Sequence, residues 1–103
     1  MPIKLIRQRD GVVRKISESH DALNLLTAED SSKVSLSIVR AEGHLDIVKT
    51  RSDRVYYVLN GILMIDDDIR AGEGDIVFIP AKSEYKLQGS FRAIVINSPA
   101  FKK

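Results

Sequence analysis

Residues 54–80, RVYYVLNGILMIDDDIRAGEGDIVFIP, contain three short runs of β-branched, aromatic and aliphatic residues separated by turn residues. Runs with this composition and these boundaries are typical of β-strands. Asn60-Gly61 predicts a two-residue hairpin turn, since a type I′ turn needs positive φ at both central positions. The acidic segment 66–68 and the glycine-rich segment 71–75 predict two further turns. This stretch alone therefore favours an antiparallel β structure.

The same signals recur along most of the chain, and no amphipathic helix is evident. Asp10-Gly11 predicts a turn between the first two strands, and we expect little regular helix in residues 17–32. The predicted strands cover residues 3–7, 12–16, 33–40, 44–50, 54–59, 62–65, 69–70, 76–80, 85–87 and 92–97. Many short strands at close spacing predict an antiparallel sandwich or a small barrel.

Size and composition indicate one soluble domain over residues 1–103. Hydrophobic residues make up 44% and charged residues 29% of the chain, which is ordinary for a globular domain. No apolar run approaches the roughly 20 residues of a membrane helix. The N-terminus lacks the apolar segment of a signal peptide.

Charge and cysteine content narrow the function classes. The net charge is only +2, which is too small to predict nucleic-acid binding. There is no cysteine, which excludes disulfides, thiolate chemistry and thiolate metal sites. We therefore expect a cytoplasmic protein without nucleic-acid or membrane partners.

Two motif fragments resemble the cupin family. Gly74 is followed by five residues and then Pro80, as at the start of the second cupin motif, and Gly61 matches the end of the first. The segment 97–101, NSPAF, is similar to the close of many small cupins. The resemblance covers residues 33–101 and implies an all-β fold, the antiparallel jelly-roll barrel of the cupins. Residues 1–32 would then form N-terminal strands and a loop.

The metal ligands of the family do not carry over with the resemblance. The position of the metal-binding Glu holds Arg54, and the last His position holds Tyr85. Two His positions fall on Ile47 and Lys49 in the register that the sequence favours. The alternative register places them on Val48 and Thr50, and the final Gly and Asn positions hold Lys82 and Gly89. Most metals of such sites need imidazole and carboxylate ligands, so we expect neither the metal nor another cofactor.

The substituted site predicts an anion-binding pocket. Alternation places Arg54, Tyr56 and Val58 on one face of a strand, and the resemblance implies that this face is interior. With Lys49 and Tyr85 nearby, the pocket would offer a guanidinium, an ammonium and two phenols. A guanidinium fork suits a carboxylate or a phosphate. The predicted ligand is a small anionic molecule, such as an acidic sugar or a sugar phosphate.

A plugged barrel is the alternative to a binding pocket. Arg54 could pair internally with Asp46, Asp53 or Glu84, because small barrels have just enough room for their own side chains. Tyr56 would then be a core residue with a solvated hydroxyl. The protein would be a structural or regulatory subunit.

A third hypothesis is a metal-free sugar isomerase, epimerase or lyase. It requires a base, for which His44 and Tyr85 are the candidates. A histidine at the start of a strand is more often a surface residue, and His20 is expected to be exposed. The resemblance and the need to cover edge strands also predict a homodimer, in which residues 2–8 could pair across the interface.

Overall fold

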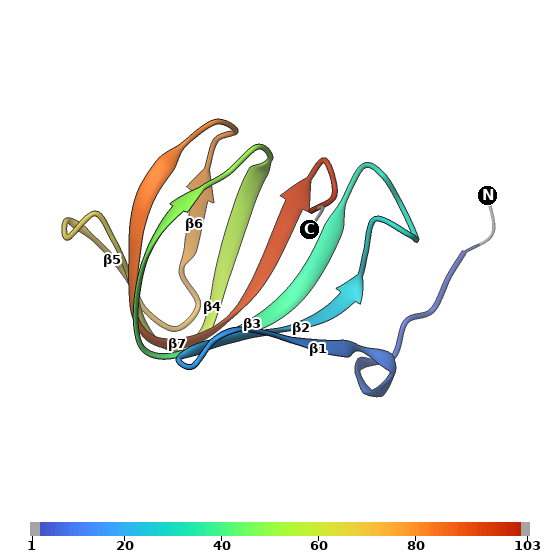
Figure 1. Cartoon of the computed structure of the whole chain (residues 1–103), viewed down its shortest axis with the longest axis horizontal. Coiled ribbons are helices and arrows are strands. Elements are labelled where there is room, and N and C mark those ends of the chain that lie inside the picture. The colour runs from blue at the N-terminus through green and yellow to red at the C-terminus, as the bar shows by residue number, and fades with distance from the viewer. Residues whose placement is uncertain (1–2, 102–103) are drawn as a thin grey trace.

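The computed structural model describes residues 3–101 as one antiparallel sheet that curves into an open barrel (Figure 1). A single 3₁₀ turn, η1 (Gln8–Asp10), precedes the sheet. The seven strands are β1 (Val12–Ser17), β2 (His20–Leu26), β3 (Ser35–Lys49), β4 (Asp53–Ile65), β5 (Ile69–Ala71), β6 (Ile76–Ile79) and β7 (Glu84–Ser98). Within residues 3–101, no helix has the length and hydropathy that a membrane span requires.

Three long strands build the barrel. The order in the sheet is β1-β2-β3-β7-β4-β5, and β6 pairs with the other part of β4. β3, β7 and β4 bend as they cross the molecule, so each contributes to both walls of the barrel (Figure 1). The predicted all-β antiparallel architecture is therefore confirmed.

Several predicted turns are β-bulges within these long strands. The expected hairpin at Asn60-Gly61 is wrong: β4 runs on to Ile65, and its register with β7 shifts between Val58 and Asn60. Gly61 has the expected positive φ of 80°, but Asn60 does not, so a type I′ turn cannot form. Segments 33–40 and 44–50 likewise join into β3, where the register shifts between Ala41 and His44. A bulge bends a strand without ending it, and it leaves much the same turn signature in the sequence.

The N-terminal prediction is also wrong. Residues 3–7 form no strand, and Ile3 and Leu5 are exposed. η1 precedes Gly11, whose φ of −69° and ψ of 156° continue an extended chain instead of reversing it. β1 therefore pairs with β2 and not with residues 3–7. Residue 2 of the segment proposed to pair between subunits lies outside the described residues.

The interior of the barrel consists of cross-strand rows of inward side chains. In one row Ala22 of β2 faces Val39 of β3, which faces Ala93 of β7, which faces Val58 of β4. All four are buried. Arg14 of β1 lies opposite Ala22 and so extends this row to the barrel wall. The inward row that contains Arg54 pairs it with Asn97 of β7 and Ile79 of β6.

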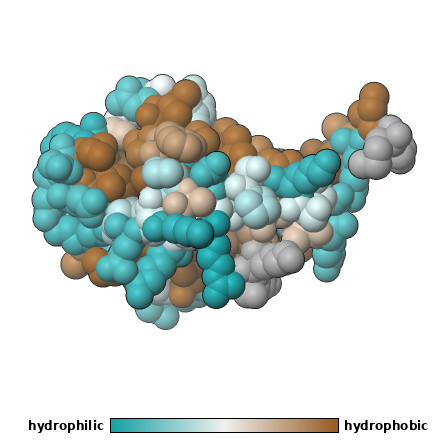
Figure 2. Space-filling view, turned by 90° about the horizontal axis from the view of Figure 1, so that it is seen from above, coloured by the Kyte–Doolittle hydropathy of each residue, from teal (hydrophilic) through white to brown (hydrophobic). Residues whose placement is uncertain are grey.

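The outer face of the same sheet is also apolar. Two rows cross it, and Arg40 and Asp21 form an ion pair of 2.9 Å beside them. On the molecular surface, hydrophobic residues gather in several patches (Figure 2). The paired residues of the two outer rows are Val13, Leu23, Ile38, Ile94, Tyr57 and Ile76 in one, and Leu36, Ile96, Val55 and Phe78 in the other.

Candidate functional site

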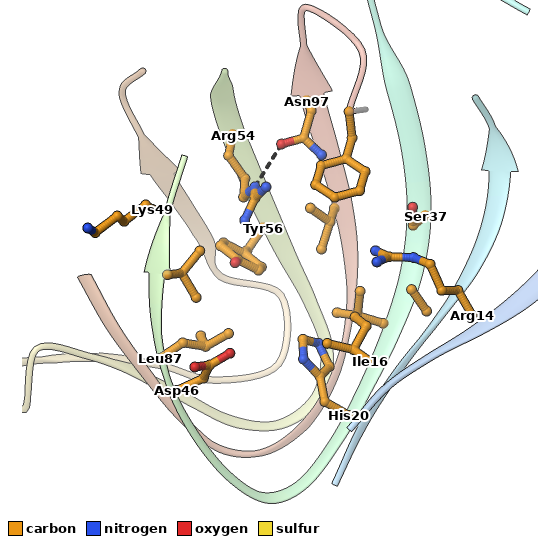
Figure 3. Close-up of a pocket in the computed structure, with 15 residues that line it drawn as sticks. Arg14, Ile16, His20, Ser37, Asp46, Lys49, Arg54, Tyr56, Leu87 and Asn97 are labelled. Carbon is orange, nitrogen blue, oxygen red and sulfur yellow. Dashed lines mark hydrogen bonds between the residues drawn. The ribbon is translucent and has the colours of Figure 1, made fainter. Parts of the chain in front are cut away.

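The barrel encloses a cavity of about 190 Å³ whose wall mixes apolar and cationic side chains. Strands from both sides of the barrel contribute to it (Figure 3). Arg54 and Asn97 lie at one end, His20 and Asp46 lie near the bend of the strands, and Arg14 approaches from β1. The side chains of residues 3–101 therefore leave room inside the barrel, which favours the binding pocket over the plugged barrel.

Arg54 is held in place by neutral groups. Its Nε donates a hydrogen bond of 2.7 Å to Oδ1 of Asn97, and its Nη1 donates one of 3.2 Å to the Tyr85 hydroxyl. The Tyr85 hydroxyl also lies 2.6 Å from the Tyr56 hydroxyl. Two donors of the guanidinium are thus used to fix its orientation, and its other N–H groups make no hydrogen bond within residues 3–101.

The Arg54 site keeps its positive charge. Burial lowers the pKa of Arg54, but the interactions with Tyr56 and Tyr85 outweigh burial, and the net direction is upward. Burial first, and the neighbouring Tyr56 second, raise the pKa of Tyr85. Tyr85 is therefore a neutral phenol that can donate a hydrogen bond, and it is a poor base.

Arg14 is a second guanidinium on the cavity wall. Its Nε is buried and has no hydrogen-bond partner among residues 3–101. Its guanidinium carbon lies 5.0 Å from the centre of the Phe101 ring, and that of Arg54 lies 6.0 Å from the same centre. Both distances are within the range of a cation–π contact. Phe101 therefore links two cationic side chains that come from opposite parts of the sheet.

His20 and His44 form a tilted ring pair whose nitrogens are mostly without partners in residues 3–101. Their ring centres are 4.4 Å apart, and Nδ1 of His44 lies 2.8 Å from the Ser19 hydroxyl. Both nitrogens of His20 and Nε2 of His44 are buried without a partner in the described part of the chain. Burial, and then the proximity of His44, lower the pKa of His20 to about 4, so His20 is neutral at pH 7. His20 lines the cavity, whereas His44 lies behind it.

No protein-family model matches the sequence, and no curated protein matches it. Solved structures do match. The cupin-fold protein KdgF from Halomonas sp. superimposes with a TM-score of 0.79 at 12% identity, over 98% of this chain and 97% of that one. The chain has the cupin fold. Ethanolamine utilization protein Q from Salmonella typhimurium gives a TM-score of 0.73 at 23% identity, covering 80% of this chain and 71% of its own.

A third cupin structure is that of the Streptomyces nucleoside dehydratase Pac13. Its TM-score is 0.76 at 19% identity, over 98% of this chain and 86% of that one. At such identities the agreement concerns the cupin fold and not the activity.

The cupin metal positions hold groups that do not suit a metal ion. Arg54 and Tyr85 occupy two of them, and the structure corrects the register of the other two. Val48 packs against the core, whereas Ile47 is 56% exposed, so Val48 and Thr50 take the inward positions. A cation, an aliphatic group and two hydroxyl-bearing side chains are a poor donor set for transition metals. No group of three or more His, Cys, Asp or Glu residues within positions 3–101 is arranged to hold a metal ion.

The carboxylates expected to neutralise Arg54 are used elsewhere. Asp53 accepts a hydrogen bond of 2.8 Å from the Ala81 amide, and Glu84 lies 3.5 Å from the Lys49 ammonium. Asp46 lies 4.0 Å from Nε2 of His44. Across the described residues, Arg54 has no carboxylate within 4.0 Å.

The predicted ligand-binding residues take different places. Arg54, Tyr56 and Tyr85 come together, and both tyrosines are buried, with hydroxyls that hydrogen-bond to each other. Arg54 and Tyr56 line the cavity, whereas Tyr85 does not. Lys49 reaches only the rim, because its side chain is 80% exposed and its ammonium faces Glu84. His44 is buried, not on the surface as expected of a strand start.

Four residues of the site were not anticipated from the sequence: Arg14, His20, Asn97 and Phe101. The expectation that His20 is exposed is wrong, because β2 places its ring inside the barrel. Alternation within 12–17 could have placed Arg14 on the same face as Ile16. No local pattern shows that this face meets Arg54, since that depends on pairing across five strands.

Proposed function

We propose that this cupin-fold protein binds a small anionic molecule, of the acidic sugar or sugar phosphate type, without a metal ion. The observation that carries the proposal is the Arg54 guanidinium, which faces the cavity with no carboxylate near it in residues 3–101. A half-buried cation without a counter-charge is costly, and an anionic ligand would offset that cost. Tyr56 contributes to the same wall.

The enzyme hypothesis has less support. The raised pKa of Tyr85 keeps it protonated at neutral pH, so almost no phenolate is present to act as a base, and His44 does not line the cavity. A metal-free isomerase, epimerase or lyase would therefore need another base. We also propose a cytoplasmic location, as the composition predicts, and cell fractionation would test it.

Replacing Arg54 with Gln should weaken anion binding at least tenfold. Glutamine can keep the hydrogen bond to Asn97 but removes the charge and the fork geometry. The measurement is the rise in melting temperature, and the Kd by calorimetry, with inorganic phosphate and glucose 6-phosphate. Glucose serves as the neutral comparison. A ligand that binds only the folded state stabilises it by RT ln(1 + L/Kd), where L is the free ligand concentration, so the melting temperature rises with ligand concentration.

Arg70→Gln is the matched control, because Arg70 is exposed on β5 and does not line the cavity. It removes the same charge and should leave anion binding within twofold of wild type. Equal responses of wild type and Arg54→Gln to both anions would show that Arg54 is not the anion site.

We further propose that two copies of the chain associate through the apolar outer rows. Val13, Ile76 and Phe78 are 59–68% exposed, although they lie in regular strands. The accessible surface is 6840 Å², against about 5,800 Å² for a typical monomer of this mass. The extended arm of residues 3–7 accounts for part of the excess. A standard interface buries about 800 Å² per partner.

Phe78→Asp should convert the dimer to a monomer. A carboxylate within an apolar interface would lose its hydration without gaining a partner. Sedimentation velocity across a concentration series gives the oligomeric state. Ile69→Asp is the control, since Ile69 is also exposed but lies on β5, outside the two rows. A wild-type chain that stays monomeric at high concentration would contradict the proposal.

A further inference from the structure

The cavity has a second cationic group that the anion site at Arg54 does not use. Arg14 lies on β1, at one edge of the sheet. Arg54 lies on β4, and strands β2, β3 and β7 come between β1 and β4 in the sheet order. Both line the same cavity. Curvature of the sheet brings the two strands to face each other across the barrel (Figures 1 and 3).

Phe101 limits how far apart the two guanidinium groups can be. Each lies near the same ring, at 5.0 Å for Arg14 and 6.0 Å for Arg54. Their separation therefore cannot exceed the sum of these two distances. A molecule of sugar size can contact both groups at once, with one anionic group at each.

Apart from its cation–π contact with Phe101, Arg14 lacks the polar contacts that a structural arginine would have among residues 3–101. No ion pair joins it to a carboxylate in the described residues, and its Nε is buried without an acceptor. A buried donor left unpaired costs roughly 1–3 kcal/mol, and more when it is charged. Beside it on the wall, His20 presents a neutral imidazole whose two nitrogens are equally unpartnered. These groups together form a polar subsite on the cavity wall, to which Asp46 also contributes.

We propose that the ligand carries two anionic groups, one bound by Arg54 and the other by Arg14, with His20 contacting the polar atoms between or beside them. This proposal rests on the proposed function and narrows its ligand class to molecules with two separate anionic groups. A dicarboxylate, or a sugar acid that also bears a phosphate, has this chemistry. The Phe101 ring lies against both guanidinium groups and would cover the ligand at the mouth of the cavity.

Three related compounds test the proposal. 6-Phosphogluconate carries a carboxylate and a phosphate at opposite ends, gluconate has only the carboxylate, and glucose 6-phosphate has only the phosphate. Calorimetry should show that wild type binds 6-phosphogluconate at least tenfold more tightly than either compound with a single anionic group. Arg14→Gln should reduce this preference to less than threefold, and Arg14→Lys should restore part of it. Arg70→Gln should leave the preference unchanged.

The outcomes separate this proposal from the proposed function. If Arg54→Gln abolishes binding but Arg14→Gln leaves the preference for 6-phosphogluconate intact, the anion site stands and the second subsite is wrong. If Arg54→Gln has no effect, the proposed function itself is wrong. If wild type shows no preference for 6-phosphogluconate, the two-anion proposal is overturned.

A measurement on wild-type protein avoids any effect of substitution on folding. The Nε–H signals of Arg14 and Arg54 can be followed by ¹⁵N NMR during the same titrations. With 6-phosphogluconate, both signals should shift with one common saturation curve. A shift confined to Arg54 would overturn the assignment of Arg14.

Discussion

Gly61→Val should lower the free energy of unfolding by more than about 3 kcal/mol. A Cβ at this position would lie 2.2 Å from the backbone oxygen of Ser90 and 2.7 Å from Cα of Phe91. Both obstacles are backbone atoms of the paired strand β7, so no rotamer change can relieve the overlap. The φ of 80° adds a second penalty, because β-branched residues strongly disfavour the left-handed region. Urea denaturation would measure the change.

Gly74→Val separates the two effects. Gly74 has a similar φ of 86°, but a Cβ there meets no atom within 4 Å. Only the penalty for positive φ remains, so we expect the free energy of unfolding to fall by about 1 kcal/mol. Equal losses at the two positions would show that the close approach of β4 to β7 at Gly61 is not rigid.

Acid should destabilise the protein through His20. The pKa of His20 is lowered from 6.5 to about 4 in the folded state, chiefly by burial and then by His44. Below pH 6.5 the unfolded chain binds a proton at this site that the folded chain does not, so stability falls as the pH drops towards 4. One pKa unit corresponds to about 1.4 kcal/mol. Solvent screens the half-buried ring, so the expected loss in the free energy of unfolding is about 2 kcal/mol.

His20→Gln isolates this contribution. The variant keeps a polar side chain of similar size but has no group that titrates in this range. The difference between the unfolding free energies of wild type and variant should change by about 2 kcal/mol between pH 7.5 and pH 4. Parallel pH profiles would mean that His20 titrates normally and is not desolvated. Subtracting the variant removes the contribution of carboxylates common to both proteins.

The sequence predicted the fold class but misjudged where strands end. Alternation and β-rich composition identify strand segments, because a residue's face in a strand repeats every second position. The predicted segments 85–87 and 92–97 are both in β7, which runs through Gly89 with a φ of 126°. A glycine between two apolar runs has the same sequence signature at a turn and at a bulge. Only the pairing partner distinguishes the two.

The same reasoning explains which part of the site could be predicted. Arg54 and Tyr56 share a strand, so alternation places them on one face, and the motif resemblance made that face interior. The favoured register of 44–50 was wrong. It was counted back from Arg54 across the connection between β3 and β4, and alternation within 44–50 does not fix the length of that connection. In the structure Val48 packs against the core and Lys49 lies at the rim.

The sequence by itself determined a β-rich chain, the inward face of residues 54–58 and the loss of metal ligands at the cupin positions. These properties depend on residue identity and on the two-residue period of a strand. The tertiary structure alone decided that Arg14 and His20 share a cavity with Arg54. It also decided that Asp53 and Glu84, two carboxylates that could have paired with Arg54, contact other groups. Sheet curvature and cross-strand register set those distances, and both arise from packing between residues far apart in the chain.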